Sequence, residues 1–370
     1  MNARTEPRGG HFRAAGRYFL AGTLVCAAAG VLLFPAELSG AVKASLEGCV
    51  EVVIPALFAF TVLAVYMQQS RLYTLALKPL TLPLSKLLGI PEELCAVFVL
   101  ANIGGYPVGA RLLSGLVREG RLSRRDAGRM LCCCYGSGPS FVIGTAGMRV
   151  FGSAAAGGIM FAACFLSSLI IAVIVCRTGG KITLGSGNMR CDLSAECFVR
   201  SVDSGARVMY TICVMAALFA AVTALLDCSR ISGLVSALLE RLGAGSNSAR
   251  IFPAFLEVTR VRDMLPGVAA APVCAGLLSF GGVCVLMQVT AVSGGNVPVK
   301  PLALSRIPAA LLSAVFAIPA GFVPAAAQET YSETAVRGEP FSVNAGLSVC
   351  VMAMAGILIL SVERSRRQRG

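Results

Sequence analysis

"ANIGGYPVGARLL", residues 101–113, interrupts a strongly apolar part of the chain. An uninterrupted membrane helix would not normally place Gly104, Gly105 and Pro107 around a tyrosine and then continue into Arg111. Glycine relaxes the restriction on backbone angles, and proline has no amide hydrogen to donate within a helix. The stretch therefore predicts a break between two short helical pieces at membrane depth.

The composition places the chain among membrane proteins with several spans. Of its 370 residues, 56% are hydrophobic and 14% are charged, and the mean hydropathy is +0.77. This is more apolar surface than one soluble core can bury. The formal net charge of +13 does not indicate a nucleic-acid partner, because the basic residues lie mostly in the tails and between the apolar runs.

Apolar runs of suitable length predict about eight transmembrane helices. The predicted spans are 18–34, 52–67, 130–147, 151–175, 205–227, 268–291, 303–325 and 344–362. The first resembles an uncleaved signal anchor, which places the amino terminus in the cytoplasm. Eight crossings return the basic carboxyl-terminal tail to the same side, in agreement with the positive-inside rule, and a loop around Lys300 and Arg306 is also expected there.

Two further apolar segments are expected to turn back instead of crossing. Segment 94–116 lies between two basic loops that are both assigned to the cytoplasm, and segment 249–267 contains Pro253 and Pro266. The sequence thus predicts an all-α, polytopic membrane fold with two re-entrant helical hairpins in an inverted repeat. The expected parts are residues 1–51, repeat one at 52–204, repeat two at 205–325, and an outer loop, helix and tail at 326–370.

Each predicted hairpin is followed by a polar, glycine-containing interruption, at residues 135–147 and 279–289. Unwound backbone at this depth is tolerated where protein or a water-filled cavity satisfies its polar groups. Close helix packing is the alternative explanation for the glycines. The residues expected at backbone breaks or along a cavity are Gly104, Gly105, Pro107, Gly136, Gly138, Pro139, Gly281 and Gly282.

Ionisable and hydrogen-bonding side chains near these breaks form the expected substrate site. Charged groups at membrane depth are costly, so they are functional candidates. An interfacial position, or an internal pair between Glu257 and Arg260, is the alternative. The expected substrate-binding residues are Asn102, Tyr106, Arg111, Ser137, Ser140, Glu257, Arg260, Ser279 and Gln288.

The sequence does not indicate an enzyme, a cofactor or a metal. The 15 cysteines include no C-x-x-C pair, and the single histidine, His11, lies in the amino-terminal tail. "GSGPS" suggests a serine nucleophile, but no histidine base lies within the membrane part. A phosphate-binding P-loop is also absent from the sequence.

Four ordered motifs resemble those of the YlbJ-type sporulation integral membrane proteins, which belong to the group with nucleoside-recognition Gate domains. They are "GGYPVGARLL", "GSGPSFVIGTAG", "FLEVTR" and "SFGGVCVLMQ", and the resemblance extends from about Glu47 to Val323. The chain departs from the family pattern at Gly104, where serine is usual, and around Tyr135 and Ser140 in the second motif. In the third motif, Arg260 follows the Glu-x-Thr segment, whereas glycine often follows it in the family.

The resemblance implies a bacterial cell-membrane protein of spore formation, located in the mother-cell-derived outer forespore membrane, that exports dipicolinate. Dipicolinate is a planar dianion, so its site should offer cations and amide donors. On this basis Arg111 and Arg260 are expected to meet at one substrate. A nucleoside or other neutral-solute carrier and a non-transporting membrane scaffold remain as alternatives, and the oligomeric state is open.

Overall fold

The computed structural model describes residues 9–70, 72–185 and 193–323. The described residues form helices and contain no strand, which confirms the all-α class. The predicted span at 344–362 and the outer loop and tail at 326–370 lie outside the described residues.

The described residues of the amino-terminal half form twelve short and long helical elements. They are α1 (Gly9–Leu33), α2 (Pro35–Gly48), η1 (Cys49–Val53), α3 (Ile54–Ser70), α4 (Tyr73–Ala76), α5 (Lys78–Leu88), α6 (Glu92–Gly104), α7 (Tyr106–Arg118), α8 (Arg124–Leu131), α9 (Pro139–Phe141), η2 (Val142–Val150) and α10 (Ala154–Thr178). Of these, η1 and η2 are π-helical.

The second half continues with nine elements up to residue 322. They are α11 (Ala195–Cys228), α12 (Ile231–Arg241), η3 (Gly245–Asn247), α13 (Ser248–Leu256), η4 (Val258–Asp263), α14 (Ala270–Phe280), α15 (Gly282–Ser293), α16 (Lys300–Phe316) and η5 (Ile318–Phe322). The last three η elements are 3₁₀ helices.

Within the described residues, four helical segments are long and apolar enough to cross a membrane. They are α10, α11, α14 with α15, and α16 with η5. The count rises to six if each of two bent pairs is one span: α1 with α2, bent by 92°, and α5 with α6, bent by 109°. These segments indicate a multi-pass membrane protein.

Two of the predicted spans take a different form. The run at 52–67 becomes α3, which has 17 residues and is shorter than the four long segments. The run at 130–147 is not one helix, because α8 ends at Leu131 and helix resumes only at Pro139. Hydropathy counts the apolar residues of this run, but the glycines and the proline within it interrupt the helix.

The outer face of α16 is apolar, whereas its inner face carries polar groups. Leu304, Ile307, Leu311 and Val315 recur every three or four residues and are exposed. The buried face of the same helix includes Arg306 and Ser313. This is the opposite of a helix on a soluble protein, whose exposed face is polar. Such an apolar outer face suits contact with lipid.

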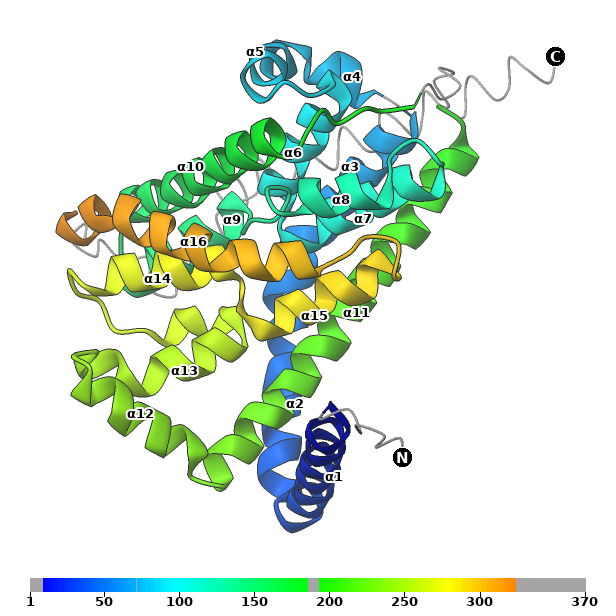
Figure 1. Cartoon of the computed structure of the whole chain (residues 1–370). Helices are drawn as coiled ribbons and strands as arrows, with labels where there is room; N and C mark the ends of the chain where they lie inside the picture. The colour runs from blue at the N-terminus through cyan, green and yellow to red at the C-terminus, as the bar shows by residue number, and fades with distance from the viewer. Residues whose placement is uncertain (1–8, 71, 186–192, 324–370) are drawn as a thin grey trace, which may run out of the picture.

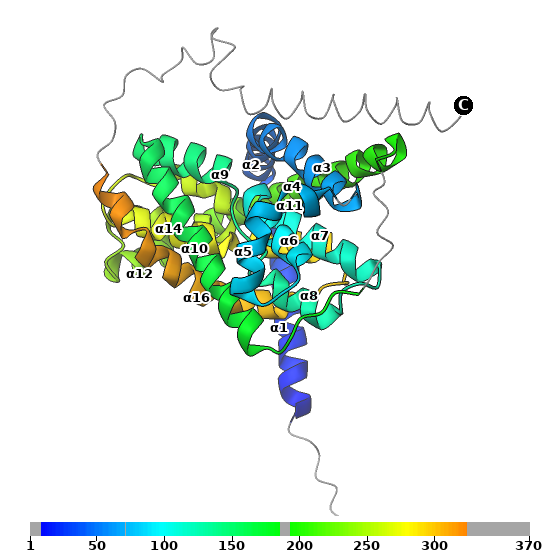
Figure 2. The same cartoon turned by 90° about the horizontal axis from the view of Figure 1, so that it is seen from above.

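Helix α6 forms the centre of the core, and it is buried on nearly every side from Leu94 to Asn102. It packs against α3, α4, α5 and α7. Elsewhere α16 lies beside α10 and α14 (Figure 1). Helix α1 projects beyond the rest of the molecule (Figure 2) and contacts α2 and α11.

Candidate functional site

A cavity of about 400 Å³ lies between the two halves of the chain, and we call it the central cavity. Its walls come from α2, η1, α3, α7, α9, η2, α11, η4 and α15. The apolar lining residues include Leu57, Ile212 and Val285. The polar or ionisable lining side chains are Ser45, Cys49, Tyr106, Ser140, Thr145, Arg149, Glu257, Thr259, Arg260, Arg262, Cys284 and Gln288.

The first break in the helices is at Gly105, between α6 and α7. Its φ of +92° and ψ of 170° lie in a region that residues with a side chain rarely adopt. Pro107 follows in the first turn of α7, where its missing amide hydrogen removes no helical hydrogen bond. The break places Gly105, Tyr106 and Pro107 on the cavity wall.

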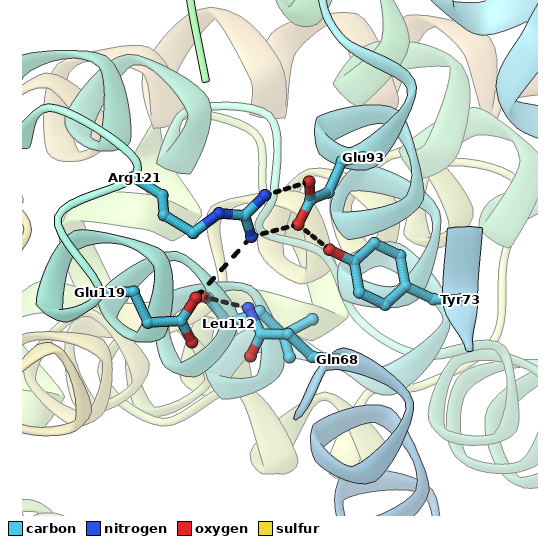
Figure 3. A network of polar contacts seen from close by, with 6 residues as sticks. All are labelled: Gln68, Tyr73, Glu93, Leu112, Glu119 and Arg121. Carbon is cyan, nitrogen blue, oxygen red and sulfur yellow. Dashed lines mark hydrogen bonds and ion pairs between the residues drawn. The ribbon is translucent and has the colours of Figure 1, made fainter. Parts of the chain in front are cut away.

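The two helices that meet at this break run back on each other. Glu93 lies in the first turn of α6, and Arg121 lies three residues beyond α7. Figure 3 shows the Arg121 guanidinium facing the Glu93 carboxylate, with both N–O distances at 2.5 Å. The ends of the segment therefore lie together, as in a helical hairpin.

Further polar contacts surround this ion pair (Figure 3). The Tyr73 hydroxyl donates to Glu93, and Glu119 lies 3.7 Å from Arg121. The hydrogen bond to Glu93 is the main cause that raises the pKa of Arg121. A separate contact joins α3 to α7: the Gln68 side chain of α3 donates to the Leu112 carbonyl of α7 at 2.7 Å. This hydrogen bond holds α3 against α7.

A second break lies at Gly281, between α14 and α15, where φ is +85°. Three successive carbonyls at the end of α14 each accept a side-chain donor. The Tyr106 hydroxyl donates to Leu278 at 2.6 Å, Arg306 Nη1 to Ser279 at 3.3 Å, and the Tyr135 hydroxyl to Phe280 at 3.0 Å. These donors replace the helical hydrogen bonds that the break removes. They also join the two halves of the chain at their breaks.

Arg306 lies in α16 and is completely buried, whereas a position in a cytoplasmic loop was expected from the sequence. Its guanidinium donates to the carbonyls of Cys132 and Tyr135 as well as Ser279, and lies 4.8 Å from the centre of the Tyr135 ring. A buried cation without such acceptors would be costly. Arg306 thus connects the irregular segment 132–138 to α14.

Four charged residues line the central cavity, three arginines and one glutamate. Glu257 is 6% exposed, whereas the side chains of Arg260 and Arg262 are 35% and 34% exposed. Both arginines point toward Asp263, at 3.5 and 3.7 Å. The third arginine, Arg149 of η2, is exposed. The cations therefore lie nearer the solvent than the carboxyl group.

The Glu257 carboxyl accepts a hydrogen bond from the Thr259 hydroxyl. Within the described residues, no lysine or arginine lies within 4.0 Å of it to form an ion pair. Glu257 is in the turn between α13 and η4, outside the helices that are long enough to span a membrane. Burial raises the pKa of its carboxyl group.

Part of the site expected from the sequence is brought together here. The substrate-binding candidates on the wall are Tyr106, Ser140, Glu257, Arg260 and Gln288, and the expected break residues on it are Gly105, Pro107 and Gly138. The remaining candidates lie off the wall: Asn102, Arg111, Ser137, Ser279, Gly104, Gly136, Pro139, Gly281 and Gly282.

Residues off the wall make contacts that hold the fold. Arg111 donates to the Ser204 hydroxyl at 2.6 Å, so α7 is tied to α11 and this arginine does not join Arg260 at the cavity. Asn102 donates to the Phe98 and Cys133 carbonyls, at 2.9 and 3.1 Å. Ser279 is buried, and its carbonyl accepts from Arg306.

Arg149, Arg262 and Thr259 line the cavity but are not among the residues expected there from the sequence. Arg149 lies between the predicted spans 130–147 and 151–175, and Arg262 lies near the end of segment 249–267. The sequence signal that could have found them is the close spacing of Glu257, Thr259 and the arginines within a segment flanked by prolines.

The described residues include no group of three or more histidine, cysteine or acidic side chains that could hold a metal.

No protein-family model, curated protein or solved structure matches the chain.

Proposed function

We propose that the chain is a membrane transporter for a small anionic solute, which binds in the central cavity. The observation that carries this proposal is the charge of the wall: three guanidinium groups line it, against one carboxyl group. Guanidinium groups bind carboxylates through charge and paired hydrogen bonds. A volume of about 400 Å³ is in the range of small-molecule sites.

The contacts between the halves support alternating access by an inverted repeat of residues 52–204 and 205–325. Elements at the same place in each half pack together, as α3 does with α11 and α10 with α16. Contacts also cross: α7 of the first hairpin packs on α15, and η4 of the second segment packs on η2. Such reciprocal contacts are expected of a pseudo-two-fold arrangement around one site.

Dipicolinate is the solute that the resemblance to the YlbJ-type proteins favours. It carries two carboxylates on a flat ring, which suits a cavity whose lining includes both guanidinium groups and apolar side chains. The proposal includes re-entrant hairpins, a bacterial cell membrane or outer forespore membrane, and cytoplasmic termini. No chemical reaction of the solute is part of it.

Flux through reconstituted vesicles tests this function. Purified protein in liposomes should exchange radiolabelled dipicolinate faster than protein-free liposomes do, and excess unlabelled dipicolinate should compete. Uridine, a neutral nucleoside, should neither compete nor move. Uridine flux without dipicolinate flux would instead identify a neutral-solute carrier. Absence of any flux with correctly folded protein would favour a non-transporting scaffold.

A further inference from the structure

Glu257 has a position that solute binding does not explain. Its backbone is extended, with φ −135° and ψ 111°, because α13 ends there and η4 begins. This turn directs the residue to the cavity wall while leaving it only 6% exposed. A carboxylate on the wall of an anion site repels the solute. Its presence therefore calls for a separate role.

Arg260 and Arg262 lower the pKa of the Glu257 carboxyl group less than burial raises it, and neither forms an ion pair with it. On its own element, Arg260 and Arg262 are directed to Asp263. Their distances to Asp263 are within 4.0 Å, whereas neither reaches Glu257 at that distance. A buried carboxylate without a cationic partner is costly, so its neutral form is favoured. Glu257 is thus suited to bind and release a proton.

The other ionisable groups on the wall come from neighbouring elements. They are Arg149 of η2, Cys49 of η1, Cys284 of α15 and Tyr106 of α7. Helices α13 and α14 also pack against η4 but place no ionisable side chain on the wall. Gln288, which donates to the Cys284 sulfur at 3.3 Å, is neutral. Among the described residues that line the cavity, Glu257 therefore carries the one carboxyl side chain.

We propose that Glu257 is the proton-binding site that couples transport of the anionic solute to proton movement. The inference rests on the proposed function. The lining residues, three arginines and one carboxylate, sum to +2 with Glu257 ionised and to +3 with it protonated. Asp263, beside Arg260 and Arg262, lowers each sum by one, so protonation still makes the cavity more positive by one charge. An anion binds better to the more positive cavity, and by reciprocity the bound anion favours protonation. Solute and proton then move in the same direction.

Two transport modes in the same vesicles separate coupling from binding. Exchange of radiolabelled dipicolinate at equal pH on both sides requires binding and movement but no net proton transfer. Accumulation driven by a proton gradient requires coupling. In Glu257→Gln, exchange should persist and gradient-driven accumulation should fall to the level of protein-free vesicles. Glu240→Gln, on the exposed surface of α12, is the matched control and should keep both modes.

A pH-sensitive dye inside the vesicles gives a second measurement that needs no variant. Dipicolinate entry through the wild-type protein should acidify the lumen, and protein-free vesicles should not. Solute flux without acidification would overturn the coupling proposal, as would normal gradient-driven accumulation by Glu257→Gln. Loss of exchange as well as accumulation in folded Glu257→Gln would also overturn it. Failure of the wild-type protein to exchange dipicolinate would instead reject the proposed function.

Discussion

Replacing an arginine at the cavity wall should change the affinity for dipicolinate, whereas replacing Arg111, which lies off the wall, should not. Replacing Arg149, Arg260 or Arg262 by glutamine removes the positive charge and the paired donors. For each, dipicolinate affinity should fall by roughly 1.5 kcal/mol, about tenfold, because Arg260 and Arg262 are partly exposed and Arg149 is exposed. Titration of purified protein in nanodiscs measures the change.

Arg111→Gln is the matched control for this series. Arg111 donates a hydrogen bond to Ser204 and is not on the wall. The affinity of the Arg111→Gln protein for dipicolinate should therefore stay at the wild-type value. The opposite pattern, in which Arg111→Gln weakens binding and the three wall variants do not, would place the anion elsewhere.

Replacing Arg306 should lower the stability of the fold, because its side chain bonds to buried carbonyls and does not line the cavity. Arg306→Gln removes donors from the buried carbonyls of Cys132, Tyr135 and Ser279. Each carbonyl left without a donor costs roughly 1–3 kcal/mol. Thermal unfolding in detergent should show a clearly lower midpoint than wild type, whereas Arg241→Gln on the exposed face of α12 should leave it unchanged. Equal midpoints for both variants would contradict the role assigned to Arg306.

At the scale of elements, the helix break at Gly105 can be tested apart from steric crowding. An added Cβ would come no closer than 3.6 Å to a neighbour, yet the backbone lies in a region almost reserved for glycine. Gly105→Ala should therefore lower the free energy of unfolding by roughly 1–3 kcal/mol through strain alone.

Gly158→Ala in the second turn of α10 provides the comparison. No atom lies within 4 Å of the added Cβ, and the backbone is helical. This variant should be stabilised by roughly 0.5–1 kcal/mol, because alanine loses less freedom than glycine in a helix. Equal effects of the two substitutions on reversible unfolding in detergent would show that the Gly105 break carries no strain.

The sequence predicted the breaks better than it predicted the side-chain neighbours. Local chemistry decides where a helix stops, so Gly105 and Gly281 could be anticipated from glycine and proline alone. Whether an arginine faces a cavity depends on how distant elements pack. Arg111 and Arg260 have similar settings in the sequence, yet only Arg260 reaches the wall, because Ser204 of α11 lies beside Arg111.

For the whole molecule, the eight predicted spans place the loop after α7 in the cytoplasm. They place the chain between spans 205–227 and 268–291, which includes α12, outside. Cysteines introduced at Glu119 and Glu240, with accessible native thiols replaced, should react with a membrane-impermeant maleimide from opposite sides. In intact cells only the Glu240 position should label, and Glu119 should label after the membrane is opened. Labelling of both in intact cells would rule out the arrangement.

The central claim is that an anionic solute occupies the central cavity, and the absence of tryptophan from the sequence allows it to be tested directly. Phe141→Trp places the single tryptophan of the protein on the cavity wall, and Phe322→Trp places it on the exposed surface of η5. Both variants should be titrated with dipicolinate in nanodiscs after their exchange activity has been verified. A saturable change in emission from Phe141→Trp, with none from Phe322→Trp, is the expected result. Unchanged emission from a Phe141→Trp protein that still exchanges dipicolinate would contradict the account.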